Sequence, residues 1–336
     1  MKLILRLVFV LAVIVVALLA VLGGGSFLSL DRDRHHSVET AALPLLDADV
    51  HDGIVRIPAN GFEFRARVAG LGNTGPGVVL LHGFPETSAM WQPLIELLAD
   101  QGYRVVAFDQ RGYSPGARPN DVAAYAISNL VDDVFAVAQA AGMKEFHLVG
   151  HDWGAGVGWA AVIARPQGIL SWTSLSIPHL AAFGGALAND PDQRRRSRYM
   201  LLFRTPWLPE ALFTFNHLAM MNDGIYREMS AVQRAEYDAV FAEPGALTAA
   251  LNWYRASSLS AVDAAPKVKL PILFIWGNQD PAVSRAAVDA QPNYIDGPFE
   301  YHELNAGHWL MEEAADTVDT MILSFLRGVD ATRTAA

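Results

Sequence analysis

The chain contains no cysteine. This absence excludes a thiol nucleophile, disulfide bonds and metal sites with cysteine ligands, although it does not reveal the redox compartment. Charged residues are also scarce, at 18% of the 336 residues, and the formal net charge is −10. Surfaces that bind nucleic acid are usually basic, so this composition argues against a nucleic-acid partner and favours a small organic substrate.

The sequence also lacks internal repeats, and outside its N-terminal segment it lacks low-complexity stretches. Hydrophobic residues make up 52% of the chain, which is enough to bury a large core. One α/β domain with an insertion suffices for a chain of this length, and two independent domains are not required.

The N-terminal segment, residues 1–30, is the most hydrophobic part of the chain. Lys2 and Arg6 open it, and residues 7–30 carry no charge. Because a membrane-spanning helix needs about 20 mostly apolar residues, the segment predicts a retained membrane anchor or a signal peptide that is cleaved on secretion. No clear small-x-small cleavage site follows the apolar core, which favours the anchor. Basic residues before the span predict an extracytoplasmic catalytic domain, and residues 31–49 are expected to form a polar linker.

Strand and helix patterns alternate after the linker. Asn60-Gly61 separates two segments of alternating apolar and polar residues, which predicts a β-hairpin. Short apolar strands then alternate with helical patterns, which is typical of a mostly parallel sheet with helices on both faces. Residues 178–266 show only helical patterns, rich in aromatic residues. The sequence therefore predicts an α/β core in two parts, 50–177 and 267–330, interrupted by a helical cap, 178–266.

A sharp turn is expected where Gly150-His151-Asp152-Trp153-Gly154 joins an apolar strand to a helix rich in small residues. Glycines on both sides leave room for such a turn, and its central side chain is held up at the carboxyl end of the sheet. Serine is the commoner residue at this central position, but here it is Asp152. One alternative is that Asp152 only caps the helix, since aspartate is a good N-cap residue.

A carboxylate nucleophile limits the chemistry that this turn can support. Attack of a carboxylate on an ester carbonyl would give a strained anhydride, whereas attack on a saturated carbon gives an alkyl ester that water can cleave. The substrate of Asp152 should therefore carry an electrophilic saturated carbon, as an epoxide or an alkyl halide does.

Two further chemistry-bearing residues follow the last strands of the core. Asp280 comes after the strand that ends near Trp276, and His308 follows the next strand. We expect both side chains to lie at the same edge of the sheet as Asp152. The order nucleophile, acid, histidine is the one expected in the hydrolase elbow fold. His308 would then activate water as a general base, and Asp280 would orient the imidazole and stabilise the imidazolium.

The segment His82-Gly83-Phe84-Pro85-Glu86 also follows a strand. A loop in this position can direct a backbone N–H towards the nucleophile. The amides of Phe84 and Trp153 are therefore expected to form a two-donor oxyanion site.

Together these motifs resemble the epoxide hydrolases of the α/β-hydrolase fold. The resemblance covers about residues 52–326 and rests on segments 82–86, 109–114 and 150–154, and on Asp280 and His308. In the cap, Leu251-Asn252-Trp253-Tyr254-Arg255 is similar to the family segment that bears one of two ring-opening tyrosines, and Tyr199 is similar to the other. Either tyrosine could instead be a core residue of an amphipathic helix.

The resemblance implies that Tyr254 and Tyr199 donate hydrogen bonds to the oxygen of a small-molecule epoxide while Asp152 attacks a ring carbon. The product is a vicinal diol. It also implies that the substrate is contacted by three aromatic residues, Trp153, Phe84 and Trp253. No cofactor or metal is required, and the histidine pair His35-His36 in the linker resembles a metal site only superficially.

Three alternatives stay open at this point. A haloalkane dehalogenase would use the same triad with Trp153 binding the halide, although that family commonly has asparagine where this chain has Phe84. A fluoroacetate-type dehalogenase would need arginines beside the nucleophile, where this chain has Trp153. A catalytically silent, membrane-attached binding protein on the same scaffold would have no need of a complete triad.

Overall fold

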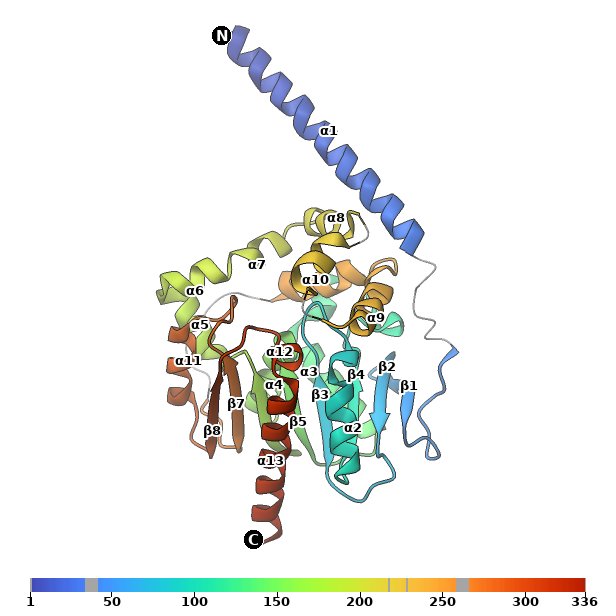
Figure 1. The fold of residues 1–336 in the computed structure, drawn as a ribbon, viewed down its shortest axis with the longest axis vertical. Helices are drawn as coiled ribbons and strands as arrows, with labels where there is room; N and C mark the ends of the chain where they lie inside the picture. The colour runs from blue at the N-terminus through green and yellow to red at the C-terminus, as the bar shows by residue number, and fades with distance from the viewer. Residues whose placement is uncertain (1, 34–41, 217, 228, 258–265, 336) are drawn as a thin grey trace.

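The computed structural model describes residues 2–33, 42–216, 218–227, 229–257 and 266–335 (Figure 1). An eight-stranded sheet has the order β1-β2-β4-β3-β5-β6-β7-β8. Its strands are β1 (Gly53–Ala59), β2 (Phe62–Ala69), β3 (Gly77–Leu81), β4 (Arg104–Phe108), β5 (Phe146–His151), β6 (Ile169–Leu175), β7 (Ile272–Gly277) and β8 (Phe299–Leu304). Strands β3 to β8 pair in parallel, while β2 is antiparallel to β1 and β4. The predicted mostly parallel sheet is confirmed.

The predicted hairpin joins β1 and β2. Asn60 and Gly61 both have positive φ angles, 49° and 79°, as a two-residue turn between twisted strands requires. In the backbone pairing of the two strands, Ala59 lies opposite Phe62. An antiparallel pair therefore begins a sheet that is otherwise built from parallel crossovers.

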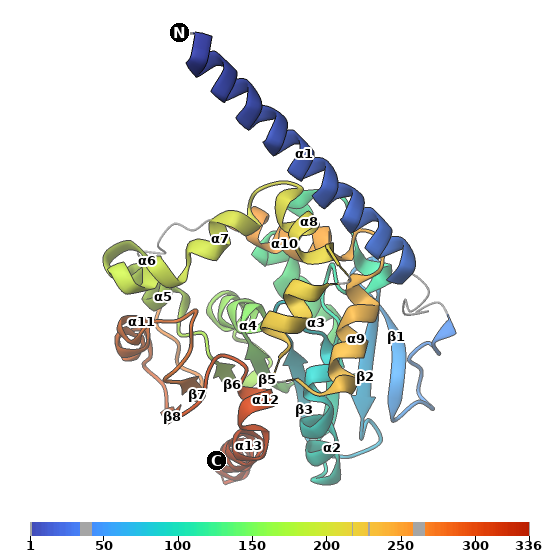
Figure 2. The ribbon, with the colours of Figure 1, turned by 45° about the horizontal axis from the view of Figure 1, so that its top comes forward.

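Helices cover both faces of this sheet (Figure 2). Helices α2 (Gln92–Asp100) and α13 (Ala315–Thr334) lie on one face, and α3 (Ile127–Ala140) and α4 (Trp153–Ala164) lie on the other. Every residue of the central strands β3, β5 and β6 is buried. Burial on both faces explains why β3 is continuously apolar in the sequence and why no residue of the three strands is a lysine, arginine, aspartate or glutamate.

Among the described residues between β6 and β7, six α-helices lie over the edge of the sheet where the parallel strands end (Figure 1). We call them the cap helices: α5 (Leu180–Asn189), α6 (Pro191–Arg196), α7 (Arg198–Phe203), α8 (Leu208–Thr214), α9 (Ala231–Phe241) and α10 (Ala246–Ala256). After β7 come two short helices that the sequence pattern did not predict, α11 (Arg285–Ala290) and α12 (Leu310–Glu313).

Helix α1 (Lys2–Asp33) projects from the cap (Figures 1 and 2). Its lower part packs against α8 and the turn after it, so that a methyl group added at Gly25 would lie 2.6 Å from the ring of Phe215. The predicted membrane span finds no support: in the part of the chain that the structure describes, no helix is both long and apolar enough to cross a bilayer. Of the expected linker, residues 34–41, with His35 and His36, lie outside the described residues.

Candidate active site

The turn between β5 and α4 holds Asp152 in a strained conformation. Its φ is 49° and its ψ is −119°, a region that residues other than glycine rarely adopt. Glycines surround it because backbone passes close by. A Cβ atom at Gly154 would lie 2.2 Å from the carbonyl oxygen of Leu81, and one at Gly83 would lie 2.5 Å from the Cβ of Asp152. The turn therefore has the form of the predicted elbow, with Asp152 at its apex.

The carboxylate of Asp152 is held between a backbone amide and an imidazole. The N–H of Phe84 donates to Oδ1 at 2.9 Å, and the Nε2 atom of His308 lies 3.4 Å from Oδ2. The side chain makes no capping hydrogen bond with α4. The alternative that Asp152 serves only as a helix cap is therefore wrong.

His308 and Asp280 come together from the ends of β8 and β7. The Nδ1 atom of His308 lies 2.8 Å from Oδ2 of Asp280. The other carboxylate oxygen of Asp280 accepts from the amides of Ala282 at 2.7 Å and Val283 at 3.1 Å. Asp280 is fully buried, so its orientation is fixed and it can in turn fix the imidazole ring.

Charges in this cluster shift the pKa values of its members. Burial by itself would raise the pKa of Asp152, but the hydrogen bond and charge of His308 bring it below its usual value. Burial by itself would lower the pKa of His308, but Asp280 and Asp152 together raise it well above its usual value. The free site thus favours an ionised Asp152 beside a protonated His308.

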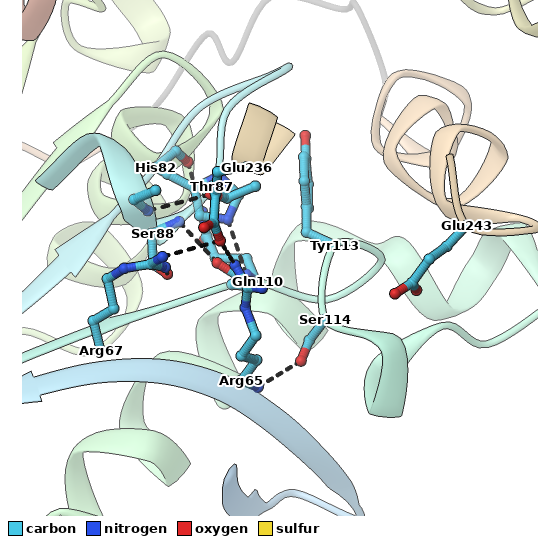
Figure 3. Close-up of polar contacts among 12 residues, drawn as sticks. Arg65, Arg67, His82, Thr87, Ser88, Gln110, Tyr113, Ser114, Glu236 and Glu243 are labelled. Atoms are coloured by element: carbon cyan, nitrogen blue, oxygen red, sulfur yellow. Dashed lines mark hydrogen bonds and ion pairs between the residues drawn. The ribbon is translucent and has the colours of Figure 1, made fainter. Parts of the chain in front are cut away.

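The loop that carries Phe84 is fixed by a buried polar network (Figure 3). His82 is buried, which lowers its pKa to about 4 and keeps the ring neutral. Its Nε2 atom accepts from the amide of Gln110 at 3.0 Å, and the Gln110 side chain donates to the His82 carbonyl oxygen at 2.6 Å. Nδ1 is therefore the protonated nitrogen and donates to the carbonyl oxygen of Gly83, 2.9 Å away.

An ionic cluster continues this network into the cap. Asp109 accepts from the amide of Ser88 at 2.8 Å and from Arg65 at 2.6 Å. Burial alone would raise the pKa of Asp109, but the charges of Arg65 and Arg67 lower this pKa to about 2. Arg65 and Arg67 also both form ion pairs with Glu236 of α9. These contacts connect the loop that carries Phe84 with the cap.

Tyr199 of α7 and Tyr254 of α10 face the nucleophile from the cap. Their ring centroids are 6.3 Å apart, and the ring of Tyr254 packs edge-on against Trp153 at 5.0 Å. Burial raises the pKa of both tyrosines, and the charge of Asp152 adds to this shift. Both hydroxyls therefore stay protonated at neutral pH and can serve as hydrogen-bond donors.

These tyrosines line a cavity of about 410 Å³ with Asp152 and Trp153. The other lining residues come from α3, α4, α5, α7, α10 and the loops beside them: Ala126, Ile127, Ser128, Gly156, Ile177, Leu180, Phe183, Gly184, Leu187, Met200, Ala256, Ser257 and Ala282. Most are apolar, and of the described residues that line the cavity only Asp152 carries a charge. The cavity is suited to an uncharged organic molecule.

Two of the three aromatic residues expected to contact substrate are absent from this described lining. The ring of Phe84 packs among Phe203, Phe213, Phe241 and Tyr254. The indole of Trp253 is buried, and its Nε1–H donates to the carbonyl oxygen of Arg111 at 2.8 Å. The structure thus corrects the expectation that the Phe84 and Trp253 side chains contact substrate. Both pack against residues that line the cavity, Phe84 against Tyr254 and Trp253 against Trp153.

Sequence reasoning missed three titratable side chains that lie close to the triad: Glu86, His151 and Glu312. Nδ1 of His151 lies 2.9 Å from Oε2 of Glu86, and its Nε2 lies 2.9 Å from the carbonyl oxygen of His308. Burial and the charge of Asp152 raise the pKa of Glu86 to about 8, and burial and Glu86 raise that of Glu312 well above its usual value. Burial lowers the pKa of His151. Because a neutral His151 donates its Nε2–H to the His308 carbonyl oxygen, its Nδ1 must accept a hydrogen bond from the protonated carboxyl group of Glu86. These contacts fix the backbone of His308.

Comparison with known proteins agrees with this geometry. The model of the alpha/beta hydrolase fold family matches residues 76–315. The chain is 32% identical to AB hydrolase superfamily protein YfhM of Bacillus subtilis, with 81% of this chain and 96% of the relative covered. It is 30% identical to human epoxide hydrolase 4, with 81% of this chain and 78% of the relative covered. It is also 32% identical to epoxide hydrolase A of Mycobacterium tuberculosis, with 79% and 95% covered.

Solved structures agree as well. The crystal structure of Bacillus megaterium epoxide hydrolase in complex with an inhibitor superposes with a TM-score of 0.73 at 26% identity, covering 81% of this chain and 99% of that one. Epoxide hydrolase A from Mycobacterium thermoresistibile gives a TM-score of 0.69 at 28% identity, covering 82% and 98%.

Proposed function

The chain belongs to the α/β-hydrolase fold family and, within it, to the epoxide hydrolases, and we propose that it converts an epoxide into a vicinal diol through a covalent ester on Asp152. One observation carries the proposal. Asp152, which lies beside His308, lines an apolar cavity that the hydroxyl-bearing side chains of Tyr199 and Tyr254 also line.

The first half-reaction opens the ring. An oxygen of the ionised Asp152 attacks one ring carbon, a new C–O ester bond forms, and the bond from that carbon to the epoxide oxygen breaks. The leaving oxygen develops negative charge and takes a proton from a tyrosine hydroxyl, while the other tyrosine donates a hydrogen bond. The result is a hydroxyalkyl ester of Asp152.

The second half-reaction hydrolyses this ester. Esterification removes the negative charge of Asp152, which is one of the two charges that raise the pKa of His308. His308 can then become neutral and take a proton from water as the water attacks the ester carbonyl carbon. The amides of Phe84 and Trp153 would hold the oxyanion. The proton that His308 gives up before this attack restores the tyrosine hydroxyl by way of solvent. Collapse then releases the diol: one proton of the water completes its second hydroxyl, and the other leaves His308 protonated beside the ionised Asp152.

A panel experiment tests the proposal. Purified protein is incubated with epoxides and with alkyl halides, and diol formation and halide release are measured separately. Diol formation without halide release is expected. Halide release with no diol would favour the haloalkane dehalogenase alternative, with the Trp153 indole as halide donor. The absence of both products would favour the silent binding protein.

Attachment of the protein to a membrane stays a second proposal, and one feature supports it. Residues 10–21 of α1 are exposed, and they are all apolar. An apolar helix surface exposed on all sides is suited to contact with lipid. Mixing the full chain and a chain that begins at Asp49 with phosphatidylcholine vesicles tests this. Sedimentation of the full chain alone with the vesicles is expected, and equal sedimentation of both would contradict the proposal.

A further inference from the structure

Four glycines lie in and just after the elbow, and three of them are required by close packing. A Cβ atom at Gly150 would lie 2.6 Å from the carbonyl oxygen of Gly154, and one at Gly154 would lie 2.2 Å from that of Leu81. A Cβ atom at Gly158 would lie 2.0 Å from the ring of Trp172. Contacts this short leave no room for a side chain, so these positions accept only glycine.

Gly156 differs from the other three. A Cβ atom there would meet only the Cε3 atom of Trp153, at 3.8 Å, which is ordinary van der Waals contact. Its backbone lies within helix α4 and has no positive φ. Glycine is unfavourable inside a helix, where alanine is the best residue. Neither packing nor backbone conformation therefore explains glycine at position 156.

The place of Gly156 in the cavity offers an explanation. It lies one helical turn after Asp152, on the same side of α4, and it lines the cavity although it is buried. Leu180, Phe183 and Leu187 line the same cavity from α5, at the spacing of a single helix face. The cavity that Gly156 lines thus has a wall of hydrocarbon and aromatic groups.

We propose that Gly156 is a specificity-determining residue, and that the space it leaves receives an uncharged, apolar substituent of the epoxide. This inference rests on the proposed function, because it assumes that Asp152 attacks the ring carbon next to that substituent. A methyl group at position 156 would occupy the space without disturbing the backbone. The added methyl group should therefore lower kcat/KM more for epoxides with large substituents than for epoxides with small ones.

Competing turnover of two epoxides tests the inference. The ratio of kcat/KM for trans-stilbene oxide, which is large and apolar, to that for propylene oxide, which is small, is measured in wild type, Gly156→Ala and Gly156→Val. One methyl group in an apolar pocket changes discrimination by about 10-fold or more. We expect the ratio to fall about 10-fold in Gly156→Ala and further in Gly156→Val.

Gly185→Ala is the matched control. Gly185 lies in α5 outside the described cavity lining, and an added Cβ atom would have no neighbour within 4 Å. The control should leave the ratio unchanged, and thermal unfolding of Gly156→Ala should occur no lower than that of wild type, since alanine favours the helix.

The possible outcomes separate the inference from the function on which it rests. An unchanged ratio in both Gly156 variants, or an equal loss for both epoxides, would overturn the role of Gly156 while leaving epoxide hydrolysis intact. Wild-type protein that opens neither epoxide would overturn the proposed function and this inference with it.

A third substrate tests the demand for an uncharged substituent. A stilbene oxide that carries a carboxylate has nearly the same shape as the neutral compound, but it would place a charge among apolar groups near Asp152. We expect wild type to convert it at least about 10-fold less efficiently. Equal conversion would show that the substituent does not enter the apolar space, and would contradict the proposal.

Discussion

The Oδ2 atom of Asp152 lies 3.4 Å from the Nε2 atom of His308. The opposite carboxylate oxygen, Oδ1, is hydrogen-bonded to the amide of Phe84 at 2.9 Å. In the proposed mechanism, this arrangement gives the nucleophile a base on one side and an oxyanion donor on the other. The same two neighbours would then lie beside the ester carbonyl that water attacks.

Replacing His308 should separate the two half-reactions. Asp152 needs no base to attack the epoxide, whereas water needs one to attack the ester. His308→Gln should therefore form the ester but hydrolyse it very slowly. Intact-mass spectrometry should show protein heavier by the mass of the substrate. Variant protein of unchanged mass, under conditions in which wild type turns over, would exclude His308 as the water-activating base.

Replacing the cap tyrosines should affect ring opening instead. An alkoxide is strongly basic and needs a proton donor, and removing one donor directed at such a charge costs on the order of 10²-fold in rate. Tyr254→Phe should slow ester formation by about this factor, and adding Tyr199→Phe should nearly abolish it. Single-turnover kinetics measure the step directly.

Two comparisons make the tyrosine experiment specific. Phenylalanine keeps the ring that packs on Trp153, so far-UV and near-UV circular dichroism of the variants should match wild type. Release of halide from any alkyl halide that the enzyme accepts should change much less, since halide is a stable anion. Near wild-type epoxide opening by the double variant would remove both tyrosines from the mechanism.

The triad was predictable because its signals are local. A turn flanked by glycines after an apolar strand indicated Asp152, and the ends of two later strands indicated Asp280 and His308. Parallel strands then bring these ends to one edge, as the 2.8 Å contact between His308 and Asp280 shows. The sequence signals indicate each residue separately, and the topology of the sheet determines which of these residues meet.

The wrong expectation for Trp253 and the missed pair of Glu86 and His151 have physical causes as well. Trp253 and Tyr254 are adjacent on α10, and side chains one residue apart on a helix point in directions about 100° apart. On α10 it is Tyr254 that lines the cavity, and the indole of Trp253 donates instead to the carbonyl oxygen of Arg111. The only sequence signal for the Glu86 and His151 pair was polar residues within two otherwise buried motifs.

The buried Glu86 should impose a pH dependence on stability. Its pKa is raised to about 8 in the folded protein, whereas the usual value for a glutamate is 4.5. Between these values the folded state holds a proton that the unfolded state releases. The free energy of unfolding should therefore fall as the pH rises from about 4.5 to 8.

Glu86→Gln should reduce this dependence, because glutamine does not titrate and its amide can still donate to His151. Relative to wild type, the variant should gain on the order of a few kcal/mol in unfolding free energy between pH 5 and pH 8. Urea unfolding at both pH values measures this. Glu96→Gln, at an exposed site on α2, should show no such gain, and an equal gain in both variants would contradict the assignment.

Isotope transfer tests the covalent mechanism most directly. A single turnover is run with excess enzyme in water labelled with ¹⁸O, and the diol and the peptide that contains Asp152 are analysed by mass spectrometry. Water that attacks the ester carbonyl leaves its oxygen in the Asp152 carboxylate, so the label should appear in the peptide and be absent from the diol. Label in the diol after the first turnover would mean that water attacks the epoxide directly, and would contradict Asp152 as the nucleophile.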